Sequence, residues 1–204
     1  RDAPLSHRHG RHLSVVDASG NAVAVTTTLN LSFGSKVTVA GAGFLLNNEM
    51  DDFSAKPGTA NFFGLVQGEN NAVEPGKRML SAMTPTIVSR PDGTPFFVTG
   101  SPGGPRIITT VFQTIVNVVD YGMNVAQAVH APRVHHQHLP DQIVYESGAL
   151  TATVLAELEA RGHVVVERVE DGGLSGSVQA IMVMPDGTLQ AASDPRGRGA
   201  AVGW

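Results

Sequence analysis

Apolar runs flank a short polar turn at three places along the chain. The three stretches are SVVDASGNAVAVTTT, PTIVSRPDGTPFFVTG and QAIMVMPDGTLQAAS, and their turns fall at 18–21, 91–93 and 185–187. Val, Ile, Phe and Thr dominate the flanks, as strands prefer. Asp-Gly and Ser-Gly-Asn supply residues that tolerate a positive φ in a tight turn. The pattern predicts three β-hairpins.

Between the hairpins, apolar residues recur at the three- and four-residue spacing of a helix. The longest such segment, 105–121, carries this spacing at Ile108, Val111, Phe112, Ile115, Val118 and Val119. A second helix is expected over 124–132, where Pro132 stops it. A third is expected over 151–161, with Leu155 and Leu158 inward and Gly162 as its stop.

The segment 34–79 is rich in Gly, Asn and Asp and is expected to be mostly loop. A long loop inside a compact domain is often functional. Antiparallel hairpins with helices grouped between them predict an α+β fold in which helices pack on a sheet.

Composition narrows the function classes. The 204 residues fit one domain or one subunit of a split protein, with 42% hydrophobic and 16% charged residues. A net charge of −4 argues against a nucleic-acid-binding surface. The absence of cysteine excludes disulfides, thiol catalysis and cysteine metal sites. No secretory signal is visible in the chain, and IITTVFQTIVNVV is too short and polar to span a bilayer, which needs about 20 apolar residues.

The stretch VTGSPGGPRIITT is the clearest chemical signal. A strand is expected to end at Thr99 and a helix to start near Arg106. The backbone N–H groups of Gly103 and Gly104 would then lie unshielded at a helix N-terminus, which favours negative charge. The stretch is a candidate oxyanion hole or carboxylate site. A plain strand-to-helix turn is equally compatible with it.

Two other stretches carry side chains of possible chemical function. Glu49, Asp51 and Asp52 in LLNNEMDDFSAKPG could bind a ligand ammonium or a metal, or cap the loop. Metal is the least favoured because no histidine lies at ligand spacing, and capping is favoured on this segment alone. HHQH at 135–138 follows a helix stop between prolines, which is more typical of a hydrogen-bonded loop than of a ligand cluster. No G-x-S-x-G nucleophile elbow occurs.

Seven stretches together resemble the small, C-terminal subunit of γ-glutamyltransferases. They run in order over almost the whole chain from His12 to Trp204, after an atypical segment at 1–11. The stretches are HLSVVDASGNAVAVTTTLN, FGSK, GFLLNNEMDDFSAKPG, PGKRMLSAMTPTIV, VTGSPGGPRIITT, YGMNVAQAVHAPRVHHQ and AASDPRGRGAAVGW. Several are long and irregular, so they are specific for the family and less so for its substrates, because the family includes cephalosporin acylases.

The resemblance implies an N-terminal nucleophile hydrolase fold, an αββα sandwich completed by a large subunit. A precursor of this kind cleaves itself and exposes a threonine, which attacks a γ-glutamyl amide such as glutathione; the glutamyl group then passes to water or to an amine. No cofactor or metal is implied. Family members are expected in the periplasm or outside the cell.

The resemblance carries over to individual residues. Thr28 resembles the threonine that hydrogen-bonds the nucleophile, and Gly103 and Gly104 resemble the oxyanion hole. The implied substrate contacts are Asn30 and Glu49 to the glutamyl α-amino group, Asp52 as its charge partner, and Ser81 to the α-carboxylate. An ammonium group is suited to a carboxylate and neutral acceptors.

Two positions depart from the family pattern. Ala82 replaces the second serine of an LSSM motif, which removes one potential donor to the α-carboxylate. Gly10 and Arg11 precede His12, where the family has Thr-Thr, and no threonine occurs before Thr26. Three hypotheses follow: a γ-glutamyl hydrolase, transpeptidase or related acylase with an unusual nucleophile; an inactive homologue with a glutamyl-binding pocket; and a truncated or altered copy of an active enzyme.

Overall fold

The computed structural model describes residues 10–168 and 176–203 of the chain. The strands are β1 (Arg11–Val16), β2 (Ala22–Thr27), β3 (Thr86–Ser89), β4 (Pro95–Gly100), β5 (Val134–His135), β6 (Ile143–Glu146), β7 (Val165–Arg168), β8 (Gln179–Val183) and β9 (Leu189–Ser193). The helices are α1 (Ile107–Val119), α2 (Val125–His130) and α3 (Ala152–Ala160), and the 3-10 turns are η1 (Glu49–Asp52), η2 (Glu69–Asn71) and η3 (Gly104–Arg106).

All three hairpins predicted from the turn sequences are present. β1 pairs with β2, β3 with β4, and β8 with β9, each antiparallel. In the first turn, Asp17 Oδ1 accepts the backbone N–H groups of Ser19 and Asn21 at 2.9 Å each, which holds the turn closed. Hydrogen bonds within the turn therefore explain why the chain reverses direction between β1 and β2.

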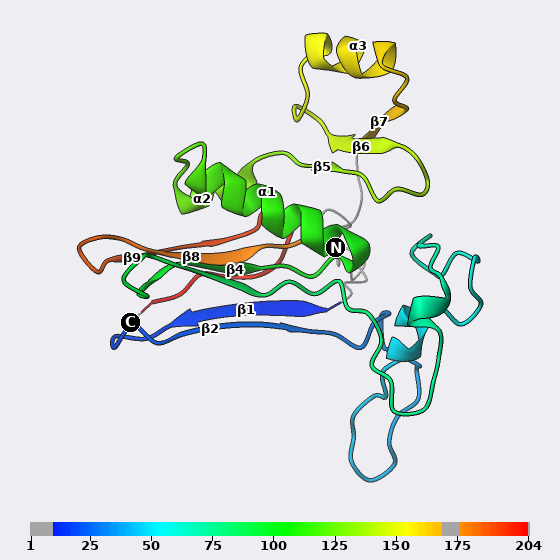
Figure 1. The fold of residues 1–204 in the computed structure, drawn as a ribbon. Coiled ribbons are helices and arrows are strands. Elements are labelled where there is room, and N and C mark those ends of the chain that lie inside the picture. The colour runs from blue at the N-terminus through cyan, green and yellow to red at the C-terminus, as the bar shows by residue number, and fades with distance from the viewer. Residues whose placement is uncertain (1–9, 169–175, 204) are drawn as a thin grey trace, which may run out of the picture.

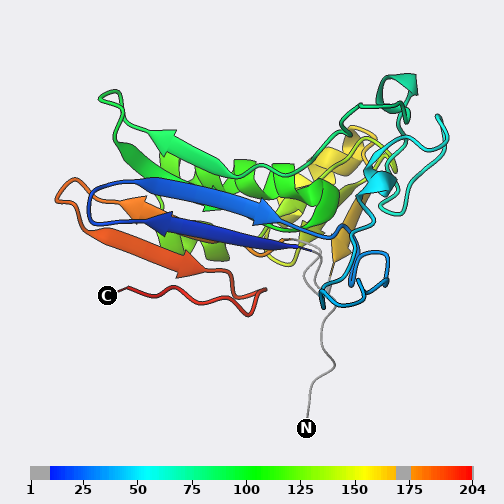
Figure 2. The same cartoon turned by 90° about the horizontal axis from the view of Figure 1, so that it is seen from below.

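The hairpins form two stacked sheets. β4 and β8 are central in a four-stranded sheet of order β3-β4-β8-β9. The β1–β2 sheet packs on one face of it, and α1 and α2 cover the other face (Figures 1 and 2). The core lies between the helices and this sheet, around Phe97, Val118, Val129 and Val178. The described residues thus supply an α-β-β part of the expected αββα sandwich.

The expected helices are present, with one change at the first. The segment predicted as a helix over 105–121 begins as the 3-10 turn η3 and becomes α-helical from Ile107 to Val119. Pro105 in this first turn has no N–H to donate, which a helix tolerates only at its start. The segment 34–79 is mostly loop, as expected, and contains η1 and η2.

One part of the fold was not predicted from the pattern. β5, β6 and β7 form a separate three-stranded sheet, in which β6 and β7 are parallel and are connected through α3. Figure 1 shows this unit extending beyond the sandwich, next to the loops of segment 34–79. β5 has only two residues, and the second, His135, opens the HHQH stretch that was expected to be loop.

The outward face of the β1–β2 hairpin is apolar. Leu13, which pairs with Val25, is 58% exposed, and Val15 pairs with the exposed Val23. Four aliphatic side chains in one cross-strand patch are suited to burial against another protein layer. No helix among the described residues is long and apolar enough to cross a membrane.

Candidate active site

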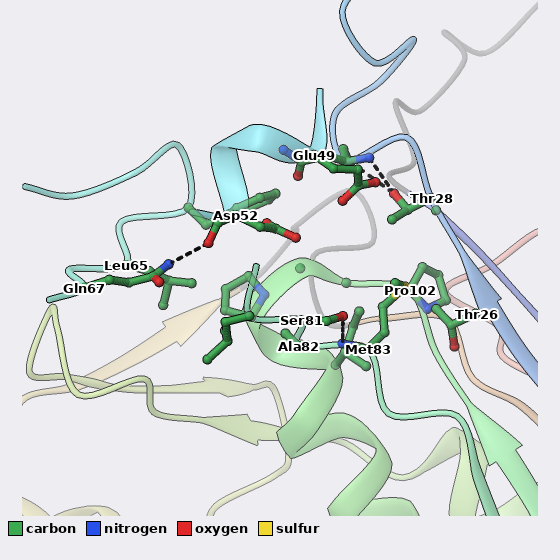
Figure 3. Close-up of a pocket in the computed structure, with 18 residues that line it drawn as sticks. Thr26, Thr28, Glu49, Asp52, Leu65, Gln67, Ser81, Ala82, Met83 and Pro102 are labelled. Carbon is green, nitrogen blue, oxygen red and sulfur yellow. Dashed lines mark hydrogen bonds between the residues drawn. The ribbon is translucent and has the colours of Figure 1, made fainter. Parts of the chain in front are cut away.

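A cavity of about 60 Å³ lies where the end of β2, the turn η1, the 63–83 loop and the turn after β4 meet (Figure 3). The structure brings all seven residues predicted from the sequence into its wall: Thr28, Asn30, Glu49, Asp52, Ser81, Gly103 and Gly104. They come from four separate segments, so the fold rather than the local sequence gathers them. We call this cavity the glutamyl pocket, after the group that the sequence resemblance implies for it.

The chain between β2 and η1 is fixed by side-chain hydrogen bonds. Thr28 Oγ1 accepts the backbone N–H of Asn30 at 2.9 Å. Asn30 has φ of 70°, a left-handed conformation that asparagine tolerates. Its buried side chain donates to the backbone oxygen of Asn48 at 3.1 Å, and Asn48 Oδ1 accepts from Leu31 N at 3.0 Å. These bonds place η1, and with it both acids, beside Thr28.

Glu49 and Asp52 lie on η1 and their side chains hydrogen-bond to each other. Partial burial, the Asp52 charge and this bond raise the pKa of Glu49 above its ordinary value. Partial burial also raises the pKa of Asp52, while the bond from Glu49 opposes that rise. Two partly buried acids beside each other therefore make this side of the pocket suited to a cation.

The two glycines after β4 have conformations that other residues rarely adopt, with φ of 146° at Gly103 and 58° at Gly104. A Cβ on Gly103 would lie 3.2 Å from Gly176 Cα, and one on Gly104 would lie 3.0 Å from the Phe63 ring. Among the described residues, neither glycine N–H donates a backbone hydrogen bond. Two available N–H groups in the pocket wall are what an oxyanion hole requires.

Gly10 forms the part of the wall that faces Thr28. A Cβ built on Gly10 would lie 3.2 Å from Thr28 Cβ and 3.4 Å from Thr28 Oγ1. Position 10 is therefore next to the threonine that was expected to contact a nucleophile. As glycine it presents no hydroxyl, and its φ of 74° suits glycine. Arg11, which was assigned to the atypical segment, already opens β1.

His12 has a structural role in this arrangement. Its ring nitrogens lie 2.8 Å from Thr26 Oγ1 and 3.0 Å from Ser14 Oγ, and Ser14 donates to the backbone oxygen of Gln179. Burial lowers the pKa of His12 to about 4, so the ring is neutral at pH 7. The ring occupies the space where a Cβ on Gly100 would lie, which locks β1 onto β4.

Several wall residues were not predicted. Thr26, Leu65, Gln67, Leu80, Met83 and Pro102 also line the pocket, as does Phe63, whose ring packs against Gly104. Gln137 Nε2 donates to the backbone oxygen of Phe63 at 3.2 Å, which ties this loop to the segment after β5. The Phe-Phe pair in an otherwise polar loop was the available signal for Phe63.

The other candidate stretches do not form a second centre. His135 Nδ1 lies 2.8 Å from Thr109 Oγ1, and His135 Nε2 lies 3.0 Å from Gln137 Oε1. His136 contacts Asp141 at 3.1 Å. Across residues 10–168 and 176–203, no group of histidine and acidic side chains could hold a metal ion. The interpretation of HHQH as a hydrogen-bonded segment agrees with these contacts.

Stacked sheets with helices on one face, a glycine-rich turn after a central strand and a pocket at the start of β1 define an N-terminal nucleophile hydrolase fold. The chain belongs to the γ-glutamyltranspeptidase family, whose model matches residues 3–204. It is 56% identical over 194 residues to a glutathione hydrolase proenzyme of Escherichia coli, covering 95% of this chain and 32% of that protein. The chain therefore spans about a third of this relative.

Solved structures agree with this assignment. A γ-glutamyltranspeptidase from Pseudomonas nitroreducens, in complex with L-DON, superposes with a TM-score of 0.85 at 53% identity, covering 95% of this chain and 98% of that chain. A cephalosporin acylase from Bacillus halodurans superposes with a TM-score of 0.80 at 29% identity, covering 95% of this chain and 34% of that one. The fold is shared by both, whereas the sequence is nearer to the transpeptidase.

Proposed function

We propose that this chain forms the glutamyl-binding part of a γ-glutamyltranspeptidase-type protein. With Gly10 and Arg11 in its sequence, it binds γ-glutamyl compounds with little or no glutamyl transfer. The observation that carries the proposal is Gly10, which faces Thr28 in the pocket wall and has no hydroxyl. Covalent acyl transfer requires a nucleophilic side chain at this point. The remaining wall offers an acidic pair for an ammonium and two N–H groups for a carbonyl oxygen.

The acidic pair favours a γ-glutamyl ligand over the acyl group of a related acylase. Glu49 and Asp52 are partly buried, so an acyl group without an ammonium would leave Asp52 without a counter-charge. Asn30 and Ser81 supply neutral polar groups in the same wall. The roles of Thr28, Asn30, Glu49, Asp52, Ser81, Gly103 and Gly104 are part of this proposal.

A large subunit completes the protein in this proposal. Relatives named as proenzymes are about three times as long as the matched region, and the apolar outer face of the β1–β2 hairpin is suited to a covering layer. We place the assembled protein in the periplasm or outside the cell, which fractionation of expressing cells would test.

The test is release of chromophore from a γ-glutamyl anilide, with the large subunit supplied. The chain as written is expected to show background turnover, while γ-glutamyl compounds bind in a calorimetric titration. Robust turnover would contradict the proposal, and mass spectrometry of the trapped acyl-enzyme would then identify the nucleophile.

The complementary variant is Gly10→Thr with Arg11→Thr, which should raise turnover. The positive φ of residue 10 is defined through its peptide bond to His9 and opposes a threonine there. Cleavage of that bond would remove the constraint, so activity and cleavage should appear together. Arg11→Thr alone is the control, because it adds a hydroxyl one position away from the pocket wall.

A further inference from the structure

A second cavity, of about 400 Å³, adjoins the glutamyl pocket. Both cavities are lined by Phe63, Gly103 and Pro105, so they share one wall beside the candidate oxyanion hole. The rest of the second wall comes from distant segments: Phe62, Arg106, His135, Gln137, Pro140, Gln142, Val144 and Arg168. We call it the basic cavity, because the described residues of its wall include two arginines and no acidic residue.

Arg168, at the end of β7, indicates most clearly what the basic cavity is suited to bind. Its Nη1 atom is buried from solvent and has no hydrogen-bond partner in the described structure. A buried charged donor without an acceptor is costly, so the site is suited to an incoming anion. The guanidinium is planar and binds carboxylates through two parallel hydrogen bonds.

The nearest acidic neighbour of Arg168 on the adjacent strand is already engaged. Glu146 is opposite Arg168 in the β6–β7 ladder. Its carboxylate accepts Arg196 Nε at 2.8 Å and the backbone N–H of Arg133 at 2.9 Å. His135, also in the cavity wall, has its pKa lowered by burial and by the charges of Arg106 and Arg168, so it is neutral at pH 7. The wall therefore favours an anion.

We propose that the basic cavity binds the distal carboxylate of a γ-glutamyl peptide, with Arg168 as the residue that recognises it. This inference rests on the proposed function, which places the α-ammonium beside Asp52. A γ-glutamyl peptide carries an α-ammonium, for the acidic pair, and an α-carboxylate at its glutamyl end, and a second carboxylate at its far end. The two cavities carry the opposite charges on either side of Gly103, where the amide between these ends would lie. Arg168 is a specificity residue for the part of the ligand beyond that amide.

The test compares γ-glutamylglycine with γ-glutamylglycinamide, which differ only in the distal carboxylate. Titration calorimetry is performed on the chain assembled with its large subunit. The free acid is expected to bind roughly tenfold more tightly than the amide. Arg168→Gln should remove most of this preference while changing the affinity for the amide by less than about twofold, and Arg168→Lys should retain part of it.

Arg161→Gln is the matched control, because it removes one exposed positive charge at the end of α3 and Arg161 lines neither cavity. It should leave both affinities unchanged. The inference is overturned if the unsubstituted protein binds the acid and the amide equally. That result is expected if a side chain of the large subunit fills the cavity. Equal weakening of both ligands by Arg168→Gln overturns it too.

A third ligand, γ-glutamylmethylamide, separates this inference from the proposed function. It has the glutamyl group and the amide but nothing to reach the basic cavity. If it binds and the distal carboxylate makes no difference, only the basic-cavity inference fails. If it does not bind, the proposed function fails and this inference fails with it.

Discussion

The glutamyl pocket and the basic cavity share a wall but differ in charge, in size and in how they are built. The glutamyl pocket measures about 60 Å³ and has an acidic pair, whereas the basic cavity measures about 400 Å³ and has two arginines. A small pocket held by the Thr28, Asn30 and Asn48 hydrogen bonds can fix one chemical group. A large cavity can discriminate by charge while accepting different shapes.

This difference separates two contributions to binding. The glutamyl pocket should supply most of the affinity, and the basic cavity should supply a preference among ligands that all carry the glutamyl group. The two contributions are measured independently as the affinity for γ-glutamylmethylamide and the ratio between γ-glutamylglycine and its amide.

Asp52→Asn should have the largest effect. It removes the carboxylate that pairs with the ligand ammonium, and hydrogen bonds to charged groups contribute about 1.5–3 kcal/mol, so affinity should fall roughly 10- to 100-fold. Titration calorimetry should show this loss for all three ligands, with an unchanged ratio of acid to amide. Asp51→Asn is the control, because Asp51 is in the same turn and does not line the pocket. A loss confined to the free acid would mean that the two cavities do not divide the ligand in this way.

Phe63→Ala should have the next largest effect, because Phe63 lines both cavities and packs against Gly104. Without the ring, water reaches the acidic pair and the cavities merge, so affinity for γ-glutamylmethylamide should fall about tenfold. The ratio of acid to amide should fall as well. Phe62→Ala provides the comparison, since Phe62 lines only the basic cavity of the two and should leave methylamide binding intact. Similar losses in both variants would argue against Phe63 as the dividing wall.

Much of the glutamyl pocket, but little of the basic cavity, could be predicted from the sequence. The hairpins depend on local turn chemistry, which the sequence displays directly, and the residues of the glutamyl pocket lie within motifs long enough to compare with a family. The basic cavity depends on Arg106, His135 and Arg168, which come from three segments and carry no common spacing. β5, β6 and β7, which hold two of these residues, are two to four residues long. Strands of this length leave no clear period, and a parallel pair has no turn signal between its members.

The pH dependence of binding should be smaller and should belong to the glutamyl pocket. The pKa of Glu49 is raised above its ordinary value of 4.5, so Glu49 keeps its proton to a higher pH than an exposed glutamate does. An ammonium ligand favours the ionised pair, so affinity should rise a few-fold as pH increases through the raised pKa, and then level off. Glu49→Gln should flatten the profile. Calorimetry in two buffers with different ionisation enthalpies should also show proton release on binding.

The titration of His12 limits how far the pH can be lowered in the binding experiment. Its pKa is lowered from 6.5 to about 4, so the stability that comes from burying a neutral ring is complete above pH 6.5 and declines as pH falls toward 4. The contribution of Glu49 to stability changes with pH in the opposite direction, because its raised pKa makes the free protein less stable as pH rises. Thermal melts at each pH therefore separate unfolding from titration of the pocket. A binding profile that follows the melting temperature would assign the pH dependence to His12 instead.

Ala82→Ser should give the smallest change, and it should be a gain. Ala82 lines the glutamyl pocket next to Ser81, whose Oγ accepts the backbone N–H of Met83 at 3.2 Å. A second hydroxyl would add one donor to the ligand's α-carboxylate, which is worth about 0.5–1 kcal/mol, or roughly two- to fivefold in affinity. The gain should appear equally with γ-glutamylmethylamide, γ-glutamylglycine and γ-glutamylglycinamide, because all three carry the same α-carboxylate. Ala82→Val is the matched control that adds volume without a donor. A gain seen only with the free acid would place the distal carboxylate, rather than the α-carboxylate, beside Ala82 and would reverse the orientation assigned to the ligand.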